Sequence, residues 1–206
     1  MSKGYETKKN IFCEATRLFA ERGFERVTMK EIGEAVGISE PGVYHHYDNK
    51  VAILDEILAR FKSKLQGYIL TKNQVDKYIE TDTTRRLLER CIGRFAEKDT
   101  LFMARAYRIV YMEHLTNQFA RNLILSQLHN ATAESIKYVL DKLIERGRIP
   151  ACDTRFYSVW WTQSMFSGAV VWISNYFNGK PVEISSAEYN NINDCIVEML
   201  MSGKVL

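Results

Sequence analysis

The sequence predicts an all-α protein in which a three-helix N-terminal domain precedes a larger helical domain, with about nine helices in all. Apolar residues recur every three or four residues along most of the chain, which is the spacing of one helix face. No stretch shows the two-residue alternation of a half-buried β-strand. In addition, residues 28–50 contain two short helical signals joined by a glycine turn.

Composition is that of a globular protein. The chain has 206 residues, of which 46% are hydrophobic and 12% aromatic, so it can bury a substantial core. The formal charge of +3 is too small to indicate nucleic-acid binding by itself, because residues 1–50 carry eight basic and eight acidic side chains. The four cysteines form no C-x-x-C pair and no signal-peptide pattern is present, so we expect a cytoplasmic protein without zinc or another cofactor.

The first short helix of residues 28–50 is marked at both ends. Thr28 and Glu31 have the spacing of a capping box, in which each side chain satisfies a free backbone N–H at the helix start. Gly37 supplies the left-handed residue that ends the helix. Between them lies a predicted core-facing stripe of Ile32, Ala35 and Val36.

The second short helix should begin almost at once. Ser39 is a good N-cap, and a proline such as Pro41 is tolerated in the first helical turn. Val43 and Tyr47 are four residues apart and are predicted to face inward, which leaves Tyr44 and His45 facing out. Two helices joined so closely match the helix-turn-helix unit that places its second helix in the DNA major groove. The alternative is an ordinary helical hairpin.

Residues 7–54 resemble the N-terminal domain of TetR-family transcriptional regulators over nearly their whole length. Pro41 stands where that family often has Gly, and Gly42 stands where a small hydroxylated residue or Ala is frequent. The resemblance implies that Tyr44 and His46 contact the DNA backbone or bases and that Lys50 meets a phosphate. It is carried by Ala15, Leu18, Phe19, Gly23, Phe24, Thr28, Ile32, Gly37, Ser39, Tyr44, Tyr47 and Lys50.

The candidate DNA-binding residues therefore lie in and beside the predicted helix pair. Residues 1–50 form the predicted DNA-binding domain, with a connector helix over about 49–70 capped by Asp48 or Asn49. The polar stretch 71–84 marks the domain boundary, and residues 71–206 form the predicted effector-binding and dimerisation domain. The DNA-binding candidates are Thr28, Ser39, Glu40, Gly42, Tyr44, His45, His46 and Lys50.

The larger domain is predicted to be built from helices over residues 85–95, 101–114, 117–146, 156–177 and 185–201. Residues 156–177 carry no charged side chain, but seven polar groups make them a poor membrane span and favour burial by protein. Asp153 is placed to cap this helix. One of its faces is a seam of small residues, namely Ser164, Ser167, Gly168 and Val171.

The last two predicted helices are amphipathic, and a two-fold axis would double them into a four-helix dimer bundle. The family resemblance implies the same arrangement, with the middle helices surrounding a ligand pocket. Aromatic side chains there suggest a lipophilic or aromatic effector, although large buried aromatic residues more often only fill the core. The tentative effector-binding residues are Phe102, Tyr107, Tyr111, Trp161, Met165 and Trp172.

An enzyme is not expected. The sequence contains no G-x-S-x-G, no P-loop, no G-x-G-x-x-G and no H-E-x-x-H, and its four histidines lack metal-ligand spacing. The function predicted is a ligand-responsive transcriptional regulator that binds a palindromic operator as a homodimer, acts as a repressor and is released by a small effector. The alternative is a constitutive DNA-binding regulator or an activator without an effector.

Overall fold

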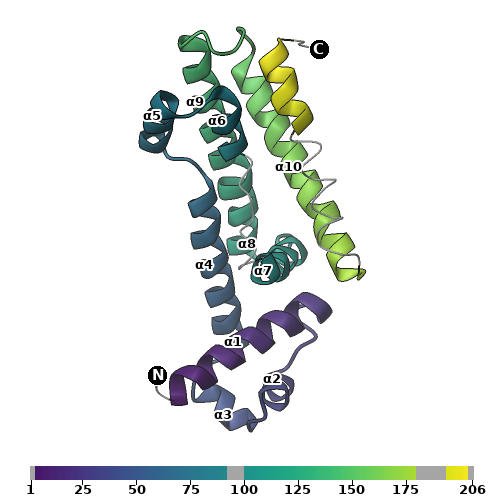
Figure 1. The fold of residues 1–206 in the computed structure, drawn as a ribbon. Helices are drawn as coiled ribbons and strands as arrows, with labels where there is room; N and C mark the ends of the chain where they lie inside the picture. The colour runs from purple at the N-terminus through teal and green to yellow at the C-terminus, as the bar shows by residue number, and fades with distance from the viewer. Residues whose placement is uncertain (1–2, 92–99, 180–193, 204–206) are drawn as a thin grey trace. The chain divides into compact units, whose positions relative to one another are not determined.

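The computed structural model describes residues 3–91, 100–179 and 194–203, and its regular elements are all helical (Figure 1). The all-α prediction is confirmed. In the described ranges, none of the helices has both the length and the apolar character that a membrane span needs.

The elements are α1 (Lys3–Arg22), α2 (Met29–Val36), α3 (Glu40–Tyr44), α4 (Lys50–Tyr68), α5 (Lys72–Thr81), α6 (Thr84–Cys91), α7 (Thr100–Glu113), α8 (Gln118–Asn122), the π-helical segment η2 (Leu123–Ala131), α9 (Thr132–Glu145), α10 (Thr154–Phe177) and a C-terminal helix over 194–202.

Several predicted boundaries agree with the structure to within a few residues. The helix expected over 117–146 is continuous, but its middle is the nine-residue π-helical segment η2, which no pattern in the sequence indicates. Asp153 caps α10, because its side chain accepts a hydrogen bond from the Phe156 N–H at 3.0 Å. Parts of the helices predicted over 85–95 and 185–201 lie outside the described residues.

The polar stretch 71–84 contains a helix that the sequence analysis did not assign. Thr71 and Gln74 form a capping box at the start of α5. Val75 and Ile79 are its buried residues, and their four-residue spacing was the available signal. The signal is weak because every other position of this short helix is polar or aromatic, so its apolar face is a single pair of side chains.

The described chain divides into two compact units. Unit 1 contains residues 3–64 and 100–124, and unit 2 contains residues 65–91, 125–179 and 194–203. Residues 100–124 therefore pack with the N-terminal helices, although the sequence analysis placed them in the 71–206 domain. The reason is aromatic packing by α7, in which Phe102 stacks on Phe12 and Tyr107 meets Phe61 edge to face. The corresponding ring centroids are 5.9 and 6.0 Å apart.

Unit 2 is built around the pairing of α9 with α10, which has the most extensive contact of any two helices in the described chain. Trp161 is fully buried at the centre of this core. Helices α5 and α6 and the C-terminal helix contribute further apolar side chains to it. The core contains Val75, Ile79, Leu87, Leu88, Ile136, Val139, Leu140, Leu143, Ile149, Tyr157, Trp161, Ile196, Val197 and Leu200.

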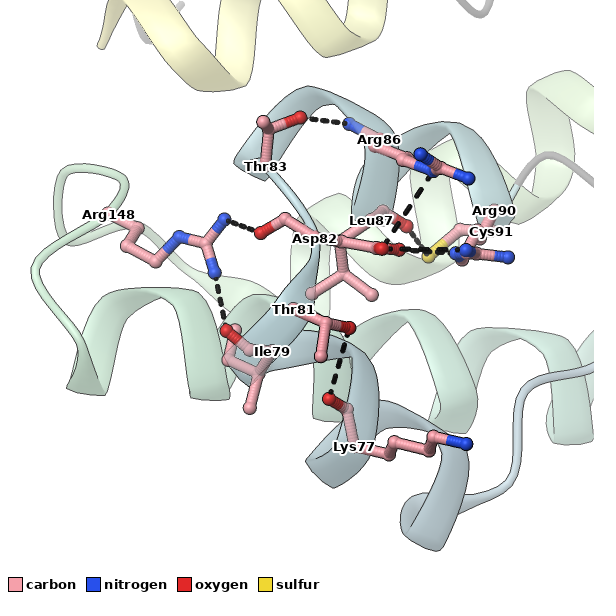
Figure 2. Close-up of polar contacts among 10 residues, drawn as sticks. All are labelled: Lys77, Ile79, Thr81, Asp82, Thr83, Arg86, Leu87, Arg90, Cys91 and Arg148. Carbon is pink, nitrogen blue, oxygen red and sulfur yellow. Dashed lines mark hydrogen bonds and ion pairs between the residues drawn. The ribbon is translucent and has the colours of Figure 1, made fainter.

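Arg148 fastens the turn between α5 and α6 to the end of α9 (Figure 2). Its guanidinium donates hydrogen bonds to the Ile79 carbonyl at 2.8 Å, the Asp82 carbonyl at 2.7 Å and the Thr84 hydroxyl at 3.0 Å. The carbonyls at the end of a helix have no partner within that helix, so a guanidinium with several donors satisfies them well. We call these four residues the arginine clasp.

Arg148→Met should lower the free energy of unfolding by about 2 kcal/mol or more, because partly buried carbonyls lose a charged donor. Arg146→Met is the matched control. Arg146 lies two residues earlier and pairs with the exposed Glu80, so its loss should cost less than about 1 kcal/mol. Urea unfolding followed by circular dichroism measures both. Equal decreases in the free energy of unfolding for the two variants would contradict a stabilising role of the arginine clasp.

Candidate nucleic-acid interface

Helix α2 begins with the capping box that its sequence predicts. The Thr28 hydroxyl accepts a hydrogen bond from the Glu31 N–H at 3.2 Å, and the Glu31 carboxylate accepts one from the Thr28 N–H at 2.8 Å. Arg22, at the end of α1, donates to the same carboxylate at 2.6 Å. Glu31 therefore joins the end of α1 to the start of α2. Hydrogen bonding to Arg22, followed by that to Thr28, lowers the pKa of Glu31 to about 2.

The buried face of α2 consists of Met29, Ile32 and Gly33. Ala35 is exposed, so the prediction that it faces the core was wrong. At 100° per residue, Ala35 lies roughly 110° from the centre of the face formed by positions 29, 32, 33 and 36. Gly37 ends the helix in the left-handed region at φ 76°, as expected.

Gly33 allows the closest approach between α2 and the turn to α3. A Cβ atom on this residue would lie 2.8 Å from the Ile38 carbonyl oxygen and 3.2 Å from a Val43 methyl group. The first distance is shorter than a van der Waals contact and involves backbone, so a side chain would push the two helices apart. The sequence analysis did not identify Gly33, since a glycine inside a helical pattern does not reveal what packs against it.

Helix α3 presents one face to the core and the opposite face to solvent. Ser39 is its N-cap and accepts a hydrogen bond from the Gly42 N–H at 3.3 Å. Val43 is fully buried and Tyr47 nearly so, as predicted. The Tyr47 hydroxyl donates to Glu56 of α4 at 2.8 Å, and burial followed by this hydrogen bond raises the pKa of Tyr47. Tyr44, by contrast, is 47% exposed.

The remaining predicted DNA-binding residues surround Tyr44. Glu40 is the first residue of α3 and is exposed, as is His45, whereas His46 is half-buried. A Cβ atom on Gly42 would make only ordinary contacts, at 3.4 Å from the Ser39 hydroxyl, so alanine would fit there. The two histidine rings lie edge to face with centroids 5.3 Å apart.

Lys50 is held by protein groups rather than extended into solvent. Its ammonium donates to the Phe24 carbonyl at 2.8 Å and the Glu25 carbonyl at 3.3 Å, and lies 4.3 Å from the centre of the Phe24 ring. An ammonium has three N–H donors, so one remains for a phosphate. The phosphate contact stays a prediction. The N-cap of α4 is Asn49, whose side chain accepts from the Ala52 N–H at 2.9 Å.

Lys8 is a cation that the set of candidate residues omitted. It is exposed on α1, and its ammonium lies 4.8 Å from the centre of the Tyr47 ring. A positive charge so near α3 suits a surface that meets phosphates. Its signal in the sequence was its position flanking the predicted helix-turn-helix.

The tentative effector residues are divided between the two units. In unit 1, Phe102 and Tyr107 pack in the aromatic contacts described above, and Tyr111 is partly exposed beside His114. In unit 2, Trp161 is in the core, Trp172 stacks on Tyr176, and Met165 packs against the core from outside. These positions agree with the core-packing alternative, and a role in binding an effector stays a prediction.

Unit 2 contains a groove of about 690 Å³ that none of these six residues lines. Its apolar part is formed by Ile69, Leu70 and Ala131. Two of its lining residues are joined, because the Ser135 hydroxyl donates to the Leu70 carbonyl at 2.8 Å. We call this hollow of unit 2 the α4–α9 groove. Its complete lining is Gln66, Ile69, Leu70, Thr71, Lys72, Gln127, Ala131, Glu134, Ser135, Lys137, Tyr138 and Asp141.

The fold and this surface define a helix-turn-helix protein. Among the residues that the structure describes, no group of three His, Cys, Asp or Glu side chains is placed to hold a metal ion. The outward face of α3 offers an aromatic side chain, imidazoles and nearby cations rather than a nucleophile beside a general base. Such a face is suited to contacts with a duplex.

Comparison with known proteins finds a family match in the N-terminal region. Residues 11–57 match the model of the bacterial regulatory proteins of the tetR family. The transcriptional repressor KstR2 of Rhodococcus jostii is 45% identical over 53 residues, which cover 26% of each chain. KstR2 of Mycobacterium tuberculosis is 30% identical over 138 residues, covering 65% of this chain and 64% of that protein. In both cases the match spans less than two thirds of the relative's length.

Solved structures show the same fold over nearly the whole chain. A transcriptional regulator from Saccharomonospora viridis in complex with choline aligns with a TM-score of 0.64 at 18% identity, covering 92% of this chain and 96% of that one. The SmeT–triclosan complex aligns with a TM-score of 0.62 at 16% identity, covering 96% and 91%. Together these comparisons support a TetR-family transcriptional regulator: residues 11–57 match the family model, and the fold over most of the chain is that of the solved regulators.

Glu31→Gln should make stability less dependent on pH. Because the folded state lowers the pKa of Glu31 from 4.5 to about 2, the carboxylate stabilises the fold above pH 4.5 and loses this contribution as the pH falls toward 2. The difference in urea midpoint between the wild type and this variant should therefore be largest above pH 4.5 and shrink below it. Glu34→Gln on the same helix is the control, since the contact of Glu34 with Lys30 is exposed and 3.9 Å long. A difference that stays constant from pH 6 to 2.5 would contradict this assignment.

Proposed function

We propose that this protein binds a palindromic operator in double-stranded DNA as a homodimer and represses transcription until a small lipophilic or aromatic effector releases it. The observation that carries the DNA-binding part is the placement of α3. Val43 and Tyr47 fix one face of that helix in the core, while Tyr44 and His45 on the other face are open to solvent. A two-fold dimer would place two such helices in successive major grooves, about 34–36 Å apart or a multiple of that distance.

The homodimer is supported by an exposed stripe on α10. Phe156, Val159 and Val171 are 58%, 47% and 47% exposed, and Gln163 and Ser167 lie between them at three- and four-residue spacing. The stripe includes part of the predicted small-residue seam, whereas Gly168 is buried within the chain. An exposed row of uncharged residues that includes apolar side chains is suited to an isologous interface.

The effector is supported by the α4–α9 groove. Its volume of about 690 Å³ is in the range of pockets that hold small molecules. Ile69, Leu70 and Ala131 suit an apolar body. The Tyr138 ring lies 5.3 Å from the Lys72 ammonium, and its hydroxyl donates to Asp76 at 2.7 Å. Two relatives in fold were solved with choline and with triclosan. A constitutive regulator without an effector, the alternative, would have no use for such a groove.

Tyr44→Ala should weaken binding to an operator selected from random duplexes by about tenfold or more, because an aromatic side chain at the centre of an interface is worth roughly 1–3 kcal/mol. Tyr111→Ala is the matched control, since Tyr111 is 43% exposed on α7 of the same unit. Both variants should unfold at the wild-type urea concentration. A mobility-shift titration in which the two variants bind equally well would contradict the proposed surface.

Lys50→Gln should lower affinity for all duplexes, as expected for the loss of a phosphate contact. The slope of log affinity against log salt concentration, here the salt slope, should fall by about one unit. It should also destabilise unit 1, because the carbonyls of Phe24 and Glu25 lose their donor. The salt slope measured well below the unfolding temperature separates these two effects. An unchanged salt slope would contradict the phosphate contact of Lys50.

Glu134→Trp should block release of the operator by an effector, because the indole would fill the α4–α9 groove that Glu134 lines. Glu145→Trp is the control, since Glu145 is exposed on the same helix and does not line the groove. A compound library that includes triclosan and choline is screened for release of labelled operator from the wild type. A releasing compound should lose potency on the first variant only. Equal potency on both would place the effector elsewhere.

A further inference from the structure

A second cavity of unit 2 also borders the α4–α5 junction. Its volume is about 370 Å³, and Leu70 is the one residue that borders both this cavity and the α4–α9 groove. Its walls come from the last turn of α4, from α5 and from α6. They consist of Gly67, Tyr68, Leu70, Gln74, Tyr78, Arg86, Glu89 and Arg90.

Arg90 is fixed in orientation within this cavity (Figure 2). Its Nε donates to one carboxylate oxygen of Asp82, and one Nη donates to the other at 3.5 Å. The flat face of the guanidinium lies 4.0 Å from the centre of the Tyr78 ring. Because a guanidinium is planar, the edge opposite Asp82 still has N–H donors directed away from that carboxylate.

Arg86 provides a second guanidinium one helical turn earlier. Its side chain is 68% exposed, and its closest approach to Asp82 is 3.8 Å. That distance is too long for a hydrogen bond, so the donors of Arg86 are much less committed than those of Arg90. Residues four apart lie on the same face of a helix, and the two guanidinium groups therefore border one side of the cavity.

The local charge is that of a site for a single negative charge. Among the residues that line the cavity, Arg86 and Arg90 stand against one carboxylate, Glu89, which leaves a net charge of +1. Hydrogen bonding to Arg90 holds the pKa of Asp82 below its usual value, so this carboxylate stays ionised. One added negative charge neutralises the group, whereas a second would meet Glu89 without a partner.

We propose that this cavity binds a small planar monoanion, an aromatic carboxylate, through Arg86 and Arg90. The carboxylate accepts hydrogen bonds from the two guanidinium groups on the α6 side, in the fork geometry that arginine offers. The aromatic body lies toward Tyr68 and Tyr78. Gly67 and Tyr68 on that side belong to the last turn of α4, whose negative dipole end disfavours an anion, and this sets the direction of the ligand.

Benzoate is the probe, titrated into the full-length protein without DNA and followed by saturation-transfer NMR. A ligand of this size should bind with a Kd on the order of 1 mM. Arg86→Gln should weaken binding about threefold to tenfold, because it removes an exposed charged donor. Arg86 is largely exposed, so this variant should keep the wild-type circular dichroism spectrum and unfolding midpoint. Arg90→Lys keeps the positive charge but loses the paired N–H donors of the guanidinium. It should weaken benzoate binding about as much as Arg86→Gln does.

Lys77→Ala is the matched control, since it removes one nearby positive charge from α5 without touching the cavity lining. It should leave the Kd unchanged. Benzamide, which is planar and neutral, and inorganic phosphate, which is not planar and carries more charge, should both bind at least several times more weakly than benzoate. Absence of saturable benzoate binding, an Arg86→Gln variant that binds as the wild type does, or equal binding of either comparison compound would overturn the proposal. Because DNA takes no part, the result is independent of the proposed regulatory function.

Discussion

The packing of α3 is the constraint on which the outward surface of unit 1 depends. A helix of five residues cannot persist by its own hydrogen bonds, because the cost of nucleation is not recovered over so short a length. Ser39 at its start, the buried Val43 and the bond from Tyr47 to Glu56 supply the missing stability. Each of these contacts also fixes the rotation of the helix, so that Tyr44 is left in solvent. Stability and presentation of the surface therefore have the same cause.

Features of this surface that depend on local chemistry could be predicted from the sequence. The capping box at Thr28, the left-handed Gly37 and the inward direction of Val43 each follow from residues within four positions of one another. Lys50 could not be predicted in the same way. Its partners are carbonyls 25 and 26 residues earlier in the chain, and no periodic pattern reports such a contact. The close contact at Gly33 was missed for the same reason, since only the position of the Ile38 carbonyl makes a side chain there unacceptable.

The larger helical region shows where prediction from sequence ends. Helix α10 and the continuous run from α8 to α9 follow from apolar spacing and capping residues. Which helices pack together does not, because Phe102 and Tyr107 are as suited to a ligand pocket as to the contacts they make with Phe12 and Phe61. The α4–α9 groove is lined largely by polar side chains. Effector candidates chosen for their aromatic side chains therefore did not include its residues. Aromatic content indicates buried volume more directly than it indicates a binding site.

Two elements belong partly to each unit, and they constrain how a ligand could act on DNA binding. Helix α4 is divided between Lys64 and Leu65, and the π-helical segment between Ile124 and Leu125. The α4–α9 groove is lined by residues that follow both divisions within a few positions, among them Gln66 and Gln127. In the proposed mechanism, a ligand there changes the preferred geometry of these two elements and must supply a coupling free energy of about 1–3 kcal/mol. A π-helical segment suits this role, because its hydrogen bonds are less favourable than those of an α-helix and a return to α-helical geometry costs little.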